Sequence, residues 1–455
     1  MRTDPGASTK ISLATRLPAM LRSALLWDSV SYFASKIVPG LLGLISVPVF
    51  IRLIGVDQYG RFAVGVPILM AVGSASSGWL AQGVLRFHPV AGDPLQCCQA
   101  FDRAVTRTTV ATVVGMCAVL ASVLVGLRTP LLLILVSLVF CLSFASYTVL
   151  LAQFQARLQP AIVLRREIVR SVGSFAIPVA LLLISGSKQF ELLLLGQALA
   201  YTIALLPWPR RSSRSIGNQV DVLDAAPFTT DSTGHTLARL WRFGWAVGLW
   251  LLLFQLLPVI DRWTIQKFAS YSSAGVYASL YEVAIRSFSF LIFPLTQAAH
   301  PRIMRAWNEG RSGESYRIIR QSVWSQLAIF GGAFAVLVFG THRITRFILG
   351  YNDATAAHLL PVLFVGGFLW QLALLVHKPL EIEQRTGAML AAISAVIAVN
   401  FLACFEFIPR FGYAAAAYIL LSSACCYLAL TLSMTRFGAL RSFCPPAAPQ
   451  WDSGD

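Results

Sequence analysis

The sequence predicts an all-α, polytopic membrane protein with about 12 transmembrane helices, arranged as two halves of six. Three observations support this fold class. Hydrophobic residues make up 56% of the 455 residues and charged residues only 12%, whereas a soluble domain carries about a quarter charged residues. Apolar runs long enough to cross the roughly 30 Å hydrocarbon core recur along the whole chain. A long polar stretch near the middle separates these runs into two groups.

The apolar runs are the expected spanning segments, and the gaps between them leave no room for a soluble domain. The fifth run is the weakest, because Arg165, Arg166, Glu167 and Arg170 crowd its start. In chain order the runs are 29–51, 62–85, 105–126, 130–152, 168–186, 190–208, 241–260, 274–299, 321–340, 357–377, 387–407 and 413–434.

The chain is expected to comprise five parts. An N-terminal tail covers residues 1–28, and it lacks the apolar run of a secretory signal peptide. Residues 29–208 form an N-terminal six-helix lobe, and residues 241–435 form a C-terminal six-helix lobe. Residues 209–240 are polar without apolar periodicity, which is typical of a linker, and residues 436–455 form a C-terminal tail.

The distribution of positive charge predicts that both termini, and the linker, are cytoplasmic. If the N-terminus is placed inside, most of the 36 lysines and arginines fall on inner segments, which is the arrangement that the positive-inside rule favours. The formal net charge of +16 is therefore mainly a topology signal. Nucleic acid is not an expected partner.

No feature predicts a cofactor or a metal. The eight cysteines have no spacing that suits a metal site, and they fit the role of small apolar residues. The chain has no Gly-rich phosphate loop, so ATP hydrolysis is not expected of it.

The two halves share a short local pattern. Gly60-Arg61-Phe62-Ala63 aligns with Gly275-Val276-Tyr277-Ala278, and each copy opens a helix that returns inward after a short outer loop. Because six is an even number, both halves enter the membrane in the same orientation. The pattern predicts parallel repeats related by an axis along the membrane normal.

Four motifs resemble those of the polysaccharide transporter family, over roughly residues 29–435. They are Arg52-Leu53-Ile54-Gly55 followed by Tyr59-Gly60, then Asp261-Arg262, then Gly275-Val276-Tyr277, and the run from Asn400 through Phe407-Ile408-Pro409-Arg410-Phe411-Gly412-Tyr413-Ala414-Ala415-Ala416. This family shares a superfamily with multidrug and toxic-compound extruders and lipid II flippases.

The resemblance implies two six-helix lobes around a central cavity, and a flippase rather than an enzyme. Such a protein moves polyprenyl-pyrophosphate-linked oligosaccharide repeat units across the bacterial inner membrane by alternating access, for O-antigen, capsule or exopolysaccharide synthesis. It implies as partners the lipid-linked oligosaccharide, membrane lipids, a coupling proton or sodium ion, and a polymerase or chain-length regulator. It implies no catalytic residue.

Charges within spans are the best candidates for function, because an ionisable residue in lipid is costly. Glu282 and Arg286 are four residues apart and share a helix face. One interpretation is a self-neutralising pair that allows the helix to insert. The other is that Arg286 binds the substrate pyrophosphate, for which a guanidinium is well suited, while Glu282 binds a proton or sodium ion.

Five further residues are candidates with alternatives left open. Lys36 and Arg107 line the cavity, or their long stems carry the charge to the membrane surface. Arg166 and Arg170 form a funnel for an anionic headgroup, or bind anionic lipid and fix the orientation. Asp261 closes an outer gate by pairing across the lobes, or lies at the interface in contact with water.

Three other classes of protein compete with the flippase. A polysaccharide polymerase or ligase would carry a large outer loop near its C-terminus, but the longest such gap is only about 341–356. A drug exporter of the same superfamily would favour acidic cavity residues for cationic drugs, whereas the candidates here are mostly basic. A major-facilitator transporter would carry a Gly-and-Arg signature that is missing between Arg86 and Arg103.

Overall fold

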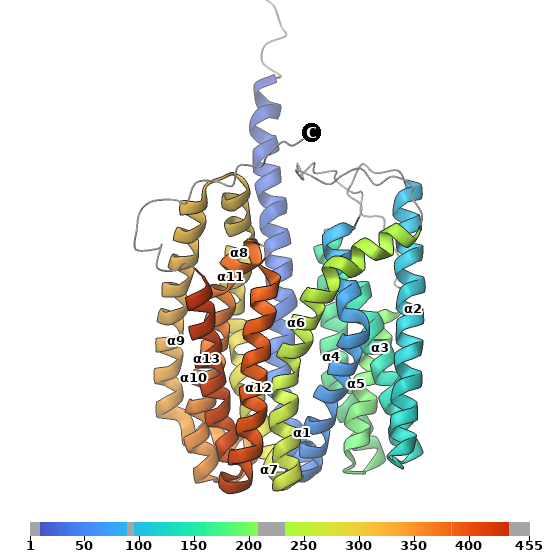
Figure 1. Ribbon diagram of the computed structural model, residues 1–455, viewed down its shortest axis with the longest axis vertical. Coiled ribbons are helices and arrows are strands. Elements are labelled where there is room, and N and C mark those ends of the chain that lie inside the picture. Colours follow the sequence, from blue (N-terminus) through green and yellow to red (C-terminus); the bar gives the residue numbers. More distant parts are fainter. Residues whose placement is uncertain (1–9, 89–94, 158, 208–232, 384, 436–455) are drawn as a thin grey trace, which may run out of the picture.

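The computed structural model describes residues 10–88, 95–157, 159–207, 233–383 and 385–435. In this part of the chain the protein is a bundle of long helices without a strand (Figure 1). The helices are α1 (Lys10–Phe87), α2 (Leu95–Gly126), α3 (Leu131–Ala156), α4 (Pro160–Ser185), α5 (Phe190–Leu205), α6 (Thr233–Phe268), α7 (Tyr271–Leu291), α8 (Phe293–Asn308), α9 (Ser312–Leu349), α10 (Ala354–Val376), α11 (Lys378–Ile382), α12 (Thr386–Phe411) and α13 (Tyr413–Met434).

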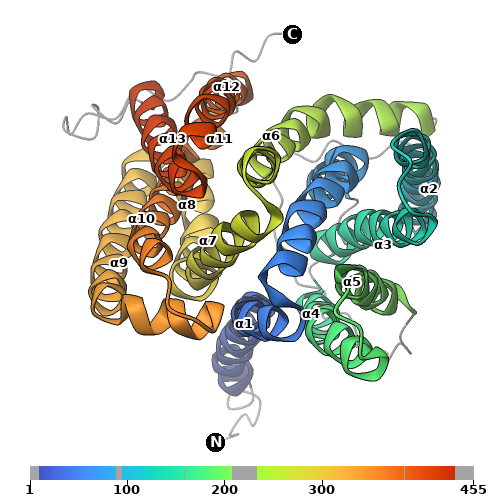
Figure 2. The same cartoon turned by 90° about the horizontal axis from the view of Figure 1, so that it is seen from below.

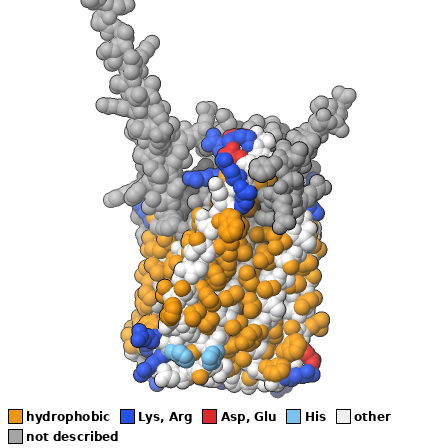
Figure 3. Space-filling model, turned by 90° about the vertical axis from the view of Figure 1, so that its left-hand side faces the viewer, with side chains coloured by type: hydrophobic (Ala, Val, Ile, Leu, Met, Phe, Trp, Pro, Cys, Tyr) orange, Lys and Arg blue, Asp and Glu red, His pale blue; other side chains and the backbone are white. Residues whose placement is uncertain are grey.

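The predicted fold class is confirmed. By length and apolar composition, 9 of the described helical segments are able to cross a membrane, and α5 is a shorter apolar helix. Two predicted spans, 29–51 and 62–85, are the two arms of α1, and the predicted span 274–299 comprises α7 with the start of α8. Each of the other predicted spans coincides with one helix. The outer surface agrees with this assignment, since Figure 3 shows a face covered by hydrophobic side chains with Lys and Arg at its two ends.

The two arms of α1 run in opposite directions because of one residue. The helix is interrupted only at Gly55, whose φ is 82° and ψ is 163°. A residue with a Cβ is strained at such a φ, whereas glycine adopts it at little cost in free energy, so glycine allows this sharp reversal. The short outer loop expected between the first two spans is therefore a single-residue break. We call the end of the bundle that contains this break the distal end, and the end where α1 begins and α13 ends the terminal end (Figure 1).

The helices form two groups. Figure 2 shows α2–α5 gathered on one side and α7–α13 on the other, with α1 and α6 between them. α1 packs against α3 and α4 of the first group, and against α6 and α7. α6 begins at Thr233, inside the stretch expected to be a linker, and residues 208–232 lie outside the described residues.

The sequence repeat brings its own two copies into contact at the distal end. A Cβ on Gly60 would lie 1.9 Å from the carbonyl oxygen of Tyr271, and a Cβ on Gly275 would lie 2.3 Å from the carbonyl oxygen of Val56. Val56 is equivalent to Tyr271 at the offset that relates Gly60 to Gly275, so the two contacts are the same contact seen from each half. Such reciprocity is what a two-fold axis produces. We call this packing of Val56–Gly60 against Tyr271–Gly275 the distal contact.

A second pair of contacts obeys the same offset deeper in the bundle. A Cβ on Gly40 would lie 3.1 Å from Cβ of Ser289. The equivalent residues in the opposite halves are Gln255 and Ser74, and the Ser74 hydroxyl donates to the Gln255 side-chain oxygen at 3.0 Å. The pseudo-two-fold relation therefore extends from the distal end into the middle of the bundle, which supports the parallel repeat.

Candidate substrate cavity

A cavity of about 600 Å³ lies between the two groups of helices. Both arms of α1 line it, together with α3, α4 and α5, while α6 and α7 contribute three charged residues from the opposite side. Its lining extends from Tyr59 near the distal contact to Leu85 and Gln155 near the terminal end. Its polar lining residues are Ser46, Tyr59, Gln82, Tyr147, Thr148, Gln155, Glu167, Arg170, Ser171, Ser174, Gln197, Tyr201, Arg262, Glu282 and Arg286.

The first charged centre of the cavity is built around Glu282 on α7. Nε of Arg286, one turn further along the helix, donates to Oε2 of Glu282 at 2.8 Å, so the predicted pair on one helix face is present. Nη2 of Arg262, from α6, donates to Oε1 of the same carboxylate at 2.7 Å. Glu282 is therefore shared by two guanidinium groups, and this group of three carries one net positive charge.

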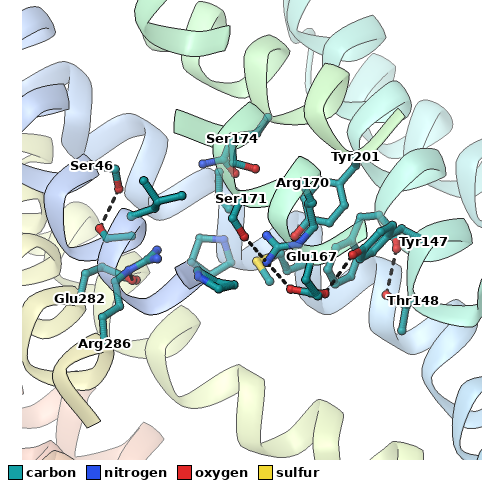
Figure 4. Close-up of a pocket in the computed structure, with 18 of the residues that line it drawn as sticks. Ser46, Tyr147, Thr148, Glu167, Arg170, Ser171, Ser174, Tyr201, Glu282 and Arg286 are labelled. Atoms are coloured by element: carbon teal, nitrogen blue, oxygen red, sulfur yellow. Dashed lines mark hydrogen bonds and ion pairs between the residues drawn. The ribbon is translucent and has the colours of Figure 1, made fainter. Parts of the chain in front are cut away.

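The arginines of this centre differ sharply in exposure. The Arg286 side chain is 37% exposed and the Arg262 side chain only 3%. Arg286 lies against the first arm of α1, where Gly43 provides the space: a Cβ there would be 1.8 Å from Nη1 of Arg286. Because its Nε holds Glu282, the terminal nitrogens of Arg286 remain beside Gly43 in the cavity wall. Figure 4 shows Arg286 next to Glu282 in this wall.

The second charged centre lies on the opposite wall, in the N-terminal half (Figure 4). Nη2 of Arg170 donates to Oε2 of Glu167 at 2.8 Å, and the Tyr147 hydroxyl donates to Oε1 of Glu167 at 2.9 Å. The Arg170 guanidinium also lies 5.5 Å from the ring centroid of Tyr201, within the range of a cation–π interaction. These contacts hold a neutral ion pair in the wall.

The remaining basic candidates either lie away from the cavity or have side chains outside the described residues. Arg166 is buried, donates to the carbonyl oxygen of Ala204 and lies over the ring of Phe154. Arg107 is exposed on α2 and is absent from the cavity lining. The side chain of Lys36 lies outside the described residues. Of the predicted substrate-binding residues, the structure thus brings Arg286 and Arg170 to the cavity.

Asp261 occupies a different position from either one expected. Its side chain is fully buried in the C-terminal half, away from water, and its hydrogen-bond partners among the described residues belong to that half. The Tyr277 hydroxyl donates to Oδ2 at 2.8 Å, while the Asn400 amide at 3.4 Å and the Cys404 thiol at 3.3 Å contact Oδ1. The neighbouring residue, Arg262, is the one that reaches across, by donating to the carbonyl oxygen of Ala63 at 3.1 Å.

Sequence reasoning missed two charged residues of the cavity. The sequence places Glu167 in a basic cluster at the start of its span, whereas in the structure Glu167 is the partner that fixes Arg170 and Tyr147. The sequence shows Arg262 only as the neighbour of Asp261, whereas in the structure Arg262 completes the centre around Glu282. The available signal was that each is an ionisable residue in an otherwise apolar stretch, for which a partner must exist.

Solved structures of transporters match this arrangement of helices, although no protein-family model and no curated protein matches the sequence. The lipid II flippase MurJ in its inward closed conformation is 12% identical, with a TM-score of 0.64 over 90% of this chain and 87% of that chain. An inward-facing multidrug resistance MATE family transporter of the MOP superfamily is 10% identical, with a TM-score of 0.58 over 91% of this chain and 94% of that chain.

A third similar structure is a MOP superfamily transporter from Pyrococcus furiosus, described as having a binding pocket of reverse polarity. It is 12% identical, with a TM-score of 0.57 over 92% of this chain and 96% of that chain. At such identities the likeness shows the fold. The chain is a multi-pass membrane protein with the two-lobe fold of MOP-superfamily transporters.

Proposed function

We propose that the protein is a flippase that moves polyprenyl-pyrophosphate-linked oligosaccharide repeat units from the cytoplasmic to the outer leaflet of a bacterial inner membrane. Transport by alternating access between the two lobes would serve the synthesis of O-antigen, capsule or exopolysaccharide. In this proposal both termini are cytoplasmic, so the cavity reaches toward the cytoplasmic side. Membrane lipids surround the protein, and a polymerase or chain-length regulator receives the repeat unit.

The observation that carries this proposal is the partly exposed Arg286 in a cavity with a net positive charge. Three arginines and two glutamates line the described cavity, and Arg286 is the most exposed member of its centre. A guanidinium stays charged and offers paired donors to phosphate oxygens. A cavity for cationic drugs would need the opposite charge balance, so the superfamily's drug exporters are a weaker model.

Uncharged polar groups in the same cavity support a sugar as the other part of the cargo. Gln82, Gln155 and Gln197 line the cavity, as do Thr148 and Ser174. Amide and hydroxyl groups both donate and accept hydrogen bonds, as sugar hydroxyls require. The lipid II flippase among the similar structures provides a precedent for a lipid-linked cargo on this fold.

The proposal is tested by the leaflet in which lipid-linked repeat units accumulate when the protein is depleted. We expect unpolymerised repeat units on the cytoplasmic leaflet, where an impermeant glycosidase added to intact spheroplasts cannot reach them, but where it reaches them in inverted vesicles. Accumulation on the outer leaflet would instead indicate a polymerase or ligase. Depletion of an unrelated membrane protein gives the background accessibility.

Glu282 is the ion-binding residue expected from the sequence, but its carboxylate is held by two arginines, so we propose Asp261 as the ion-coupling residue in its place. The groups that hydrogen-bond the buried Asp261 carboxylate are neutral, so a proton or a sodium ion would neutralise it in the membrane. We expect Asp261→Asn, which keeps the shape, to remove the stimulation of transport by an imposed ion gradient. The measurement is the initial flipping rate in proteoliposomes with and without a proton or sodium gradient. Stimulation equal to that of the wild type would remove Asp261 from the coupling step.

A further inference from the structure

Arg262 forms a buried hydrogen bond between the halves beside the distal contact. Its guanidinium comes from α6 and is almost fully buried, and Nη1 donates to the carbonyl oxygen of Ala63 on α1 at 3.1 Å. Ala63 lies three residues after Gly60, which packs against Tyr271 in the distal contact. A buried charge-assisted hydrogen bond is among the stronger single interactions in a protein. Arg262 therefore helps to hold the two halves together at the distal end.

Glu282 connects this hydrogen bond to the cavity. Its Oε1 accepts from Nη2 of Arg262 at 2.7 Å and its Oε2 accepts from Nε of Arg286 at 2.8 Å. Only Arg286 is exposed enough to meet a cargo anion, since its side chain is 37% exposed and that of Arg262 is 3% exposed. One carboxylate therefore contacts both the cavity arginine and the arginine at the distal end.

Arg262 is incompletely satisfied in this conformation. Its Nε is buried and has no hydrogen-bond partner among the residues that the structure describes, which costs free energy for a buried charged group. Nε and Nη2 lie on the same edge of the guanidinium, an edge that a single carboxylate can bridge with both oxygens. Nη2 already binds Oε1 of Glu282, and the oxygen that would fill Nε is the one that Arg286 holds. A second arrangement of the three side chains is thus available.

We infer that an anion bound by Arg286 weakens the distal contact through Glu282 and the positioning residue Arg262. The anion draws Arg286 away, Oε2 of Glu282 pairs with Nε of Arg262, and the guanidinium turns so that Nη1 leaves the Ala63 carbonyl. The halves then separate more readily at the distal end, which opens the cavity to the opposite side of the membrane. The inference rests on the proposed function, since the anion it requires is the pyrophosphate of the cargo.

The thermodynamic condition for this coupling is differential affinity. A ligand shifts a conformational equilibrium only by as much as it binds one state more tightly than the other. The anion meets this condition because it competes with Glu282 for Arg286 while the distal contact is closed, and has no such competitor once Glu282 is paired with Arg262. By reciprocity, the distally open state should bind the anion more tightly.

Hydrogen exchange measured by mass spectrometry on the full-length protein in lipid nanodiscs tests the inference. The probes are inorganic pyrophosphate and polyprenyl pyrophosphate, and binding of each is measured separately by calorimetry on the same sample. We expect bound pyrophosphate to raise the exchange rates of segments 56–63 and 271–279 by about 10-fold, the equivalent of roughly 1.4 kcal/mol. Segments of α12 should keep their rates.

Two glutamate variants sharpen the result. Glu282→Gln should still bind pyrophosphate at Arg286, yet the exchange rates of the distal segments should no longer respond to it. Glu406→Gln is the matched control, because Glu406 forms the same four-residue ion pair with Arg410 on α12 but both side chains are exposed. This control should keep the full response. If Glu282→Gln does not fold, the wild-type comparison with and without pyrophosphate decides alone.

The outcomes separate this inference from the function on which it rests. Binding of pyrophosphate with unchanged exchange in both distal segments overturns the inference and leaves the proposed function standing. A distal response that persists in Glu282→Gln also overturns it, because the signal would then bypass Glu282. If neither inorganic pyrophosphate nor polyprenyl pyrophosphate binds, the proposed cargo is contradicted, and the inference that rests on it is contradicted too.

Discussion

Arg286→Glu is expected to abolish transport of lipid-linked oligosaccharide while the protein still inserts and folds. The substitution places two carboxylates one helical turn apart in the cavity wall and removes the guanidinium that faces the cargo. Losing a charge-assisted hydrogen bond costs up to about 3 kcal/mol, and each 1.4 kcal/mol is tenfold, so we expect the initial rate to fall by about 100-fold. The measurement is flipping of a polyprenyl-pyrophosphate oligosaccharide in proteoliposomes.

Arg410→Glu provides the matched control for this variant. Arg410 also pairs with a glutamate four residues away, but both side chains of that pair are exposed on α12, outside the cavity. The control introduces the same charge reversal and the same local repulsion, which is worth only a few tenths of a kcal/mol at an exposed site. We expect it to transport at the wild-type rate. Equal loss in both variants would attribute the effect to the fold rather than to the cavity.

Gly275→Ala is expected to separate the halves at the distal end and to slow the transport cycle. Its Cβ would lie 2.3 Å from the carbonyl oxygen of Val56, a backbone atom that cannot rotate away. The two helices must therefore move apart, which removes the closed state shown here. A cysteine placed at Ala63, which is buried beside the distal contact and lines the cavity, should then react with a membrane-impermeant thiol reagent from the distal side several-fold faster than in the wild-type background. Flipping should fall by about 10-fold, as for a loss of roughly 1.4 kcal/mol.

The pseudo-two-fold relation makes a second variant informative. Gly60→Ala should have the same effect as Gly275→Ala, because its Cβ would lie 1.9 Å from the carbonyl oxygen of Tyr271. The double variant should lose less transport than the sum of the two single losses, since both substitutions break one shared contact. Gly65→Ala on the same arm of α1 is the control, because its added Cβ meets no atom of the other described helices within 4 Å. A normal transport cycle in Gly275→Ala would show that the distal contact is not a closed gate.

The fold was predictable because its determinants are local. Apolar runs of the right length identify the spans, and the repeated Gly-X-aromatic-Ala pattern identifies the equivalent helices, whose two glycines lie against each other in the structure. What could not be predicted was how the first two spans join. The sequence around Gly55 is compatible with a short loop and also with a reversal at one residue of positive φ. Only the backbone dihedral angles distinguish these two connections.

The site was predictable only in part because its contacts join distant parts of the chain. Glu282 and Arg286 share a helix face by spacing alone, so their pairing was foreseen. The contacts of Arg262 with Glu282 and Ala63 join three helices, and no local pattern encodes them. Asp261 illustrates the opposite error, since its place near a span end suggested water contact while tertiary packing buries it against Tyr277.

The central claim is that the cavity carries a pyrophosphate-linked oligosaccharide across the membrane, and flipping by the purified protein tests it most directly. Proteoliposomes are loaded with a polyprenyl-pyrophosphate oligosaccharide, and the fraction cleaved by an impermeant glycosidase is followed over time. We expect the wild-type protein to expose the inner pool, polyprenyl pyrophosphate to compete, and Arg286→Glu to leave that pool protected. Export of a cationic drug from the same vesicles, with no movement of the lipid-linked oligosaccharide, would contradict the claim.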